Sequence, residues 1–188
     1  MSTHTPTAPA AADHTAAALA ELSRLPQDAF VARLDGIFEH SPWIAERAWS
    51  AGPFASIDAL HAAMCLVVDT ADATEQLALI CAHPELAGKE AEAGTMTNDS
   101  VSEQASAGLD ALTRDEMLRM RELNARYRAR HGFPFIIAVR RHTKASIFSE
   151  FSRRLDNDSE TELQECLAQI FVITRLRLHA LAGETAPV

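Results

Sequence analysis

Apolar residues recur at intervals of three and four along almost the whole chain, and this spacing restricts the possible fold more than any other feature. From about Ala16 onwards the pattern is that of amphipathic helices, while runs that alternate apolar with polar residues, as strands require, are few. Only 7 residues are glycine, so flexible turns between elements are rare. We expect an all-α protein that forms a single compact domain of about eight helices.

The chain is long enough for one domain with its own core and too short for two of ordinary size. Its 188 residues are 47% hydrophobic and 23% charged, which is typical of folded globular domains. Residues 1–14, in contrast, contain almost no large apolar side chains, so burial cannot offset the entropy lost on ordering them. We expect a disordered tail over residues 1–14 and one helical domain over residues 15–182.

The charge balance and the apolar runs exclude several classes of partner. Acidic residues outnumber basic residues by 26 to 17, and the resulting net charge of −9 disfavours binding to nucleic acid. No stretch approaches the roughly 18 apolar residues of a membrane-spanning helix, and the first residues lack the basic-then-apolar pattern of a secretory signal. We therefore expect a cytoplasmic protein with no membrane partner.

Metal and nucleotide sites leave sequence signatures that this chain lacks. The three cysteines, Cys65, Cys81 and Cys166, are odd in number and too far apart for a thiolate metal clip. None of the eight histidines belongs to an HExxH motif, and the sequence contains neither GxGxxG nor GxxxxGK[ST]. We expect reduced, mostly buried cysteines, no metal site and no nucleotide cofactor.

Two consecutive helices are expected before an irregular connection. The apolar stripe over residues 56–71 predicts one helix. The next begins near Thr74 and is stopped by Pro84, which lacks the amide that a helix interior requires. His83 is therefore expected at a helix end. Residues 85–99 contain two glycines and no periodicity, which predicts a long loop.

Three later helix starts show the spacing of a capping box, in which a hydroxyl and a carboxylate exchange hydrogen bonds with the backbone. The pairs are Ser100 with Glu103, Thr113 with Glu116, and Ser159 with Glu162. The second of these helices should end at Gly132, because glycine accepts a left-handed conformation, and a further helix is expected over residues 143–155. The last helix, over 159–181, has more apolar positions than one stripe accommodates, so it lies either in the core or at a subunit interface.

Two residues are candidates for catalysis, because each has a side chain that can take part in acid–base chemistry and is expected near a helix end. His83 titrates near neutral pH and could project into a cavity from a helix end, although a structural, hydrogen-bonded histidine is the alternative. Glu103 could serve only its capping box, but a carboxylate at a helix N-terminus is also fixed in place and ionised. The apolar run from Phe133 to Ile137 breaks the helical pattern around a proline and predicts a buried extended segment.

Five motifs, found in order within residues 22–178, resemble the decarboxylase of 2-oxo-4-hydroxy-4-carboxy-5-ureidoimidazoline (OHCU). They are Phe38-Glu39-His40-Ser41-Pro42-Trp43; His83-Pro84-Glu85-Leu86-Ala87-Gly88-Lys89; Ser100-Val101-Ser102-Glu103-Gln104 running into Ala107-Gly108-Leu109; Leu123-Asn124-Ala125-Arg126-Tyr127 followed by Gly132-Phe133-Pro134-Phe135-Ile136-Ile137; and Glu150-Phe151-Ser152-Arg153-Arg154-Leu155-Asp156-Asn157. Each motif alone is weak, whereas all five in sequence are specific.

The resemblance implies an all-helical, cofactor-free carboxy-lyase that forms a homodimer. Its reaction would be the decarboxylation of OHCU to (S)-allantoin, the last step of urate-to-allantoin conversion in purine catabolism. His83 matches the family's catalytic histidine and Glu103 its acidic partner. The substrate-contacting segments correspond to Pro84, Ser100, Val101, Ser102, Gln104, Phe133, Pro134, Phe135, Ile136 and Ile137.

Some alternatives stay open at this point. We expect Glu103 to hold the ureido or ring nitrogens of the substrate and to orient the His83 imidazole. The anionic substrate also needs a local cation or several backbone donors, and Arg140, Arg154 and Arg177 are the candidate cations. Two other functions compete with the decarboxylase: an inactive helical interaction module, and a lyase of the same scaffold that acts on another ureide.

Overall fold

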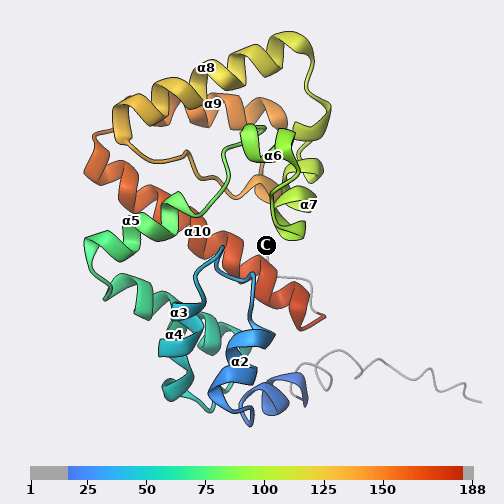
Figure 1. Ribbon diagram of the computed structural model, residues 1–188, viewed down its shortest axis with the longest axis vertical. Coiled ribbons are helices and arrows are strands. Elements are labelled where there is room, and N and C mark those ends of the chain that lie inside the picture. The colour runs from blue at the N-terminus through green and yellow to red at the C-terminus, as the bar shows by residue number, and fades with distance from the viewer. Residues whose placement is uncertain (1–16, 184–188) are drawn as a thin grey trace, which may run out of the picture.

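The computed structural model describes residues 17–183, apart from the side chain of Glu92, and these residues form helices without any strand (Figure 1). Residues 17–22 are helical, and nine α-helices follow: α2 Gln27–Arg33, α3 Pro42–Ala48, α4 Ile57–Asp69, α5 Ala73–Cys81, α6 Lys89–Ala93, α7 Asn98–Ser106, α8 Arg114–His131, α9 Lys144–Arg154 and α10 Ser159–Leu181. Short 3-10 helices occupy Trp49–Ala51, Leu109–Ala111 and Val139–Arg141. The expected all-α domain is confirmed, while the tail expected over residues 1–14 lies outside the described residues.

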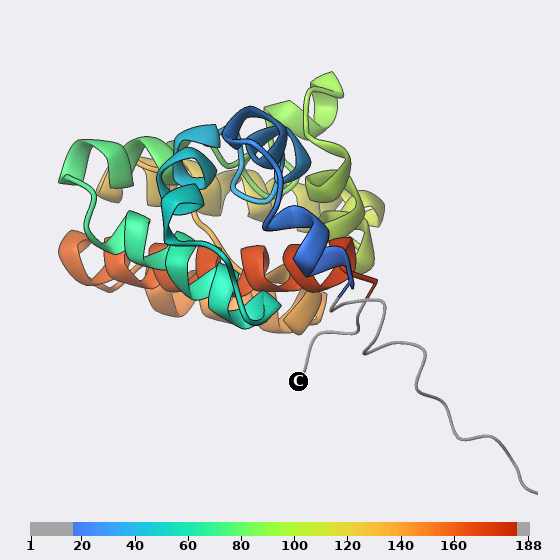
Figure 2. The same cartoon turned by 90° about the horizontal axis from the view of Figure 1, so that it is seen from below.

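Helix α10 forms the axis of the domain. In Figure 1 it runs obliquely between α8 and α9 above and α2 to α4 below, and Figure 2 shows α4 lying alongside it. Its contacts with α4, α5 and α8 bury Cys166, Leu167, Ile170 and Leu178. The surplus of apolar positions in this helix is therefore used inside the domain, which favours the core alternative over the subunit interface. Over residues 17–183, neither α10 nor any other helix is long and apolar enough to span a membrane.

Several helix boundaries follow from the local signals in the sequence. Ser56 caps α4, because its hydroxyl accepts a hydrogen bond from the Ala59 amide. Thr113 and Glu116 form the expected reciprocal capping box at the start of α8. The same helix ends at Gly132, whose φ of 82° is left-handed. The predicted capping box at Thr113 and the predicted end at Gly132 are confirmed, and the helix predicted from the stripe over residues 56–71 is observed as α4.

The connection over residues 85–99 is not the uninterrupted loop that we expected. It contains α6, whose sequence Lys-Glu-Ala-Glu-Ala consists of strong helix formers. Gly94 ends this helix with a φ of 66°. Five residues are too few to show periodicity, so this helix could not be expected from the sequence pattern.

Two of the three predicted capping boxes are wrong. Helix α7 is capped by Thr97, whose hydroxyl accepts from the Ser100 amide, and Ser100 itself lies inside the helix. Helix α10 is capped by Asp158, one residue before the expected Ser159. In both cases the carboxylate assigned to the box, Glu103 or Glu162, is buried and bonded to an arginine instead.

Candidate functional site

A small cavity lies where the chain after α5, helix α7, the segment 133–139 and helix α10 meet. It is lined by His83, Pro84, Leu86, Ser100, Glu103, Gln104, Phe135, Ile136, Ile137, Val139, Ile173 and Arg177. Its free volume is about 30 Å³, which is enough for one or two water molecules. The cavity is therefore narrow, and it is partly open to solvent.

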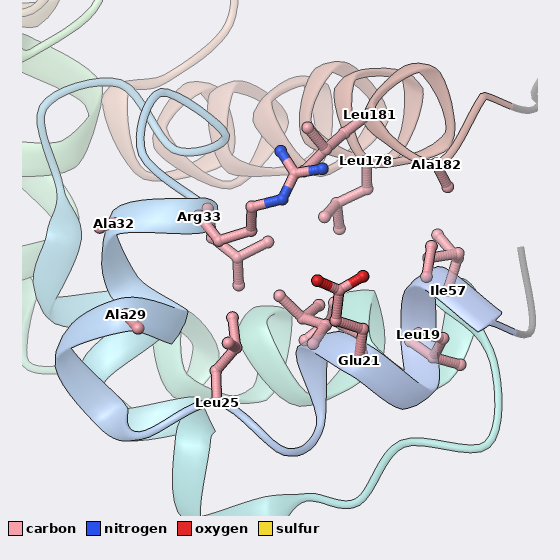
Figure 3. A pocket seen from close by; sticks show the side chains of 14 residues that line it. Leu19, Glu21, Leu25, Ala29, Ala32, Arg33, Ile57, Leu178, Leu181 and Ala182 are labelled. Carbon is pink, nitrogen blue, oxygen red and sulfur yellow. The ribbon is translucent and has the colours of Figure 1, made fainter.

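A larger cavity elsewhere lacks comparable chemistry. It measures about 450 Å³ and lies between residues 17–22, α2, α4 and the end of α10 (Figure 3). Leucine, isoleucine and alanine side chains line most of it, and Glu21 and Arg33 are its two charged residues. The candidate active site is thus identified by its titratable groups and not by its size.

His83 is fixed at the end of α5 by one ring nitrogen, and its other ring nitrogen has no hydrogen-bond partner among the described residues. Its Nδ1 donates a hydrogen bond to the Leu79 carbonyl oxygen over 2.9 Å, so Nε2 carries the lone pair of the neutral imidazole. The side chain is buried, and Nε2 has no hydrogen-bond partner among the described residues. Burial lowers the pKa of His83 to about 4. At neutral pH the cavity therefore contains an uncharged base.

Glu103 is fixed by a two-pronged ion pair with Arg177. Arg177 donates from Nε and Nη2 to the two carboxylate oxygens over 2.9 and 2.8 Å. The other N–H groups of this arginine reach the Gly36 carbonyl, the Glu39 carboxylate and the Ser100 hydroxyl. All five guanidinium donors are therefore engaged, whereas Glu103 keeps acceptor capacity towards the cavity.

The expected orienting role of Glu103 towards His83 is wrong. The imidazole is oriented by the Leu79 carbonyl one helical turn earlier in the same helix. No hydrogen bond joins His83 to Glu103 among the described contacts, although both side chains line the same cavity. The two groups can thus act on different parts of a ligand between them.

The loop after His83 is clamped by Gln104. The Gln104 side-chain oxygen accepts from the Ala87 amide over 2.8 Å, and its nitrogen donates to the Glu85 carbonyl over 3.3 Å. Asn124 on α8 donates to the Leu86 carbonyl over 2.9 Å. The motifs around residues 83, 103 and 124 are therefore joined in space by side-chain to backbone bonds.

Eight of the twelve residues assigned to the site line the cavity. They are His83, Pro84, Ser100, Glu103, Gln104, Phe135, Ile136 and Ile137. Phe133 is buried close by, while the side chains of Val101 and Ser102 are exposed on the outer face of α7. Pro134 is buried as well but does not line the cavity.

The structure separates the three candidate arginines. Arg177 lines the cavity, Arg140 is exposed, and Arg154 is buried without reaching the cavity. Arg154 pairs with Glu162 and donates to the Ile136 carbonyl over 2.7 Å, and its guanidinium lies 4.4 Å from the Phe135 ring centroid. It therefore supports the 133–139 segment from behind.

Two residues at this site were missed by the sequence reasoning. Glu39 binds Arg177, and Gln169 on α10 accepts from the Ala138 amide over 2.9 Å. Glu39 had a usable signal, because it is a charged residue within the motif Phe38-Glu39-His40, which resembles the family. Gln169 had none, because one glutamine within an apolar helix is unremarkable in sequence.

The buried neutral histidine should make folding stability depend on pH in a defined window. An unfolded His83 titrates near 6.5 and the folded one near 4, so the unfolded state binds the proton first as the pH falls. The contribution of the buried neutral His83 to the free energy of unfolding is constant above pH 6.5 and is lost progressively as the pH falls to 4. The loss at pH 5 should be about 2 kcal/mol.

Urea unfolding at pH 7.5 and pH 5 measures this loss, with His83→Asn as the comparison protein. The variant lacks the titrating group and retains all others. Between pH 7.5 and pH 5 its unfolding free energy should therefore fall by about 2 kcal/mol less than that of the wild type. Equal pH dependence in both proteins would show that His83 is not buried in its neutral form.

No group of three or more His, Cys, Asp or Glu side chains within the described part of the chain is arranged to hold a metal ion. The cavity instead offers one neutral base, one carboxylate, one charged guanidinium and apolar walls. This set suits acid and base chemistry on a small polar ring that carries N–H groups.

Comparisons with known proteins agree on one family. A family model described as OHCU decarboxylase matches residues 23–179. A 2-oxo-4-hydroxy-4-carboxy-5-ureidoimidazoline decarboxylase of Haloferax volcanii is 43% identical over 160 residues, which cover 85% of this chain and 93% of that protein.

Solved structures show the same similarity. The crystal structure of an (S)-allantoin synthase is similar with a TM-score of 0.68 at 30% identity, covering 87% of this chain and 53% of that one. The crystal structure of an OHCU decarboxylase in the presence of (S)-allantoin shares the fold, with a TM-score of 0.64 at 24% identity and coverage of 79% and 96%.

Proposed function

The chain belongs to the OHCU decarboxylase family, and from this premise we propose that it decarboxylates OHCU to (S)-allantoin with His83 and Glu103 as its catalytic residues. One observation carries the proposal for these residues: an imidazole nitrogen without a partner and a fixed carboxylate, both on buried side chains and twenty positions apart in sequence, line the same cavity. An inactive interaction module has no need for a desolvated base without a partner, because an unpaired buried polar atom lowers stability.

The reaction cleaves one carbon–carbon bond and consumes one proton. The substrate carboxylate leaves as carbon dioxide, its bonding electrons pass into the conjugated ring, and a ring nitrogen takes up a proton from solvent. The hydroxyl then becomes a carbonyl, and a ring carbon gains one proton in place of the one that the hydroxyl loses. A neutral His83 can accept the hydroxyl proton of the substrate at Nε2 and return a proton to one face of the ring, which yields a single enantiomer.

Glu103 and Arg177 have complementary tasks in this proposal. The Glu103 carboxylate accepts hydrogen bonds from the ureido or ring N–H groups of the substrate. Arg177 holds the Glu103 carboxylate in place, because its five donors already serve protein groups and none is left for the substrate. Phe135, Ile136 and Ile137 form apolar walls that exclude water and strengthen these interactions.

The activity is tested with freshly generated OHCU and purified protein. Because the intermediate also decays slowly to allantoin without help, the measurement must follow both the rate and the handedness of the product by circular dichroism. Rapid formation of (S)-allantoin supports the proposal. A rate and product mixture equal to those of the blank would exclude it, and activity on another ureide alone would favour the second lyase.

The homodimer and the cytoplasmic location stay predictions of the resemblance. The apolar positions of α10 that first suggested a subunit interface pack inside the domain, so they no longer support the dimer. Light scattering at working concentrations measures the oligomeric state, and a monomer would refute the dimer. Fractionation of cells that contain the protein tests the location.

A further inference from the structure

A second carboxylate lies directly behind the candidate active site. Glu39 is located between α2 and α3, is 1% exposed and does not line the cavity. One of its oxygens accepts from the hydroxyls of Thr97 and Ser100 over 2.7 and 3.0 Å. The other accepts from Nη1 of Arg177 over 2.7 Å. Glu39 therefore joins the first turn of α7 to α10.

This arrangement places Arg177 between two carboxylates. Glu39 binds its Nη1 nitrogen, while Glu103 binds Nε and Nη2. Burial alone would raise the pKa of Glu39, but the charge and hydrogen bonds of Arg177 outweigh burial, and the pKa of this carboxyl lies below its usual value. Glu39 is thus ionised, and the three charged groups carry a net charge of −1.

The geometry points to Glu39 as a positioning residue of the proposed decarboxylase: by fixing Arg177 from behind, it keeps the Glu103 carboxylate oriented towards the substrate. The inference rests on the proposed function. Without Glu39, Nη1 of Arg177 retains the Gly36 carbonyl but loses its charged partner. The guanidinium can then tilt, and Glu103, which is bound through two parallel hydrogen bonds, tilts with it.

Two substitutions separate the effect of the Glu39 charge from the effect of its side-chain length. Glu39→Gln keeps the shape but removes the charge and places an amide N–H where an acceptor is needed. Glu39→Asp keeps the charge but is one methylene shorter, so its carboxylate cannot reach Arg177 and the α7 hydroxyls together. Because Glu39 does not line the cavity, both variants should keep its walls and bind substrate with little change, while the misoriented Glu103 carboxylate slows turnover.

We expect kcat to fall about 10- to 100-fold in both variants, with KM changed less than threefold. Glu75→Gln is the matched control, since it breaks a carboxylate–arginine pair with the exposed Arg47 at a distance from the site, and it should retain the wild-type kcat. A folded Glu39→Gln protein with wild-type kcat would overturn the inference. If Glu39→Gln does not fold, the same measurement is made on Glu39→Asp, and a wild-type kcat in that variant would overturn the inference.

A spectroscopic measurement excludes a merely structural role and does not depend on activity. In protein labelled with ¹⁵N-arginine, Nε–H of Arg177 and of Arg154 should both exchange slowly with solvent, because both are buried and paired. Glu39→Gln should accelerate exchange at Arg177 by at least tenfold and leave Arg154 unchanged. Equal acceleration at both sites would indicate general loosening and refute positioning. An inactive wild-type protein would instead refute the proposed function.

Discussion

Replacing His83 with Asn should reduce the rate of (S)-allantoin formation by about 10²- to 10⁴-fold, which corresponds to about 3–5 kcal/mol of transition-state stabilisation. The asparagine amide can still donate to the Leu79 carbonyl that now holds Nδ1, so the end of α5 should keep its structure. What disappears is the basic Nε2 nitrogen in the cavity. Stopped-flow circular dichroism of the product measures the loss.

His40→Asn provides the matched control for this substitution. His40 is the other histidine that could carry the proton, but its side chain is exposed, and asparagine tolerates the left-handed φ of 47° found at this position. This variant should keep the wild-type rate. Loss of activity in His40→Asn together with full activity in His83→Asn would assign the proton transfer to His40 and contradict the proposal. Far-ultraviolet circular dichroism verifies that both variants remain helical.

Replacing Glu103 with Gln should lower kcat/KM by about 10²- to 10³-fold, or about 3–4 kcal/mol. The substitution removes the charge that accepts substrate N–H groups. It also turns an amide N–H towards Arg177, which already uses two donors at this place. Because Arg177 keeps Glu39 as a partner, its charge is not left alone in the interior, and the protein should still fold.

Glu116→Gln tests whether this loss is specific to the site. Glu116 is likewise a helical carboxylate that pairs with a cation, Lys144, over 2.8 Å, but it lies in the first turn of its helix, is partly exposed and lies outside the cavity. Its replacement should leave kcat/KM within twofold of wild type. Wild-type activity in Glu103→Gln would return Glu103 to a purely structural role, and urea unfolding of both variants would then show how much stability it supplies.

The features that could be predicted from sequence are those encoded by neighbouring residues. Helix boundaries at Ser56, Thr113 and Gly132 follow from hydroxyl caps and from the left-handed preference of glycine, which act within one turn. Family motifs placed His83 and Glu103 together even though spacing alone could not. The caps at Thr97 and Asp158 were mispredicted because several adjacent polar residues can serve, and tertiary contacts decide which one does.

Contacts between residues far apart in sequence could not be predicted, for a different reason. Glu39 and Arg177 are 138 residues apart, and no periodicity or composition relates them. Arg154 and Arg177 look equivalent in sequence, since each lies near the end of an amphipathic helix. Only the packing of α9 and α10 determines that one supports the 133–139 segment and the other lines the cavity.

Helix α10 carries Glu162 near its start and Arg177 near its end, which are separated by roughly 22 Å at 1.5 Å per residue. Glu162 anchors the wall of the pocket through Arg154, and Arg177 anchors Glu103, the carboxylate proposed to be catalytic. Helix α10 therefore fixes the distance between these two ion pairs, one in each half of the molecule. A shift of α10 by a single residue along its axis would disrupt both ion pairs at once. Heating should for this reason abolish turnover and melt the core in one cooperative transition, with no partly unfolded species that still turns over substrate.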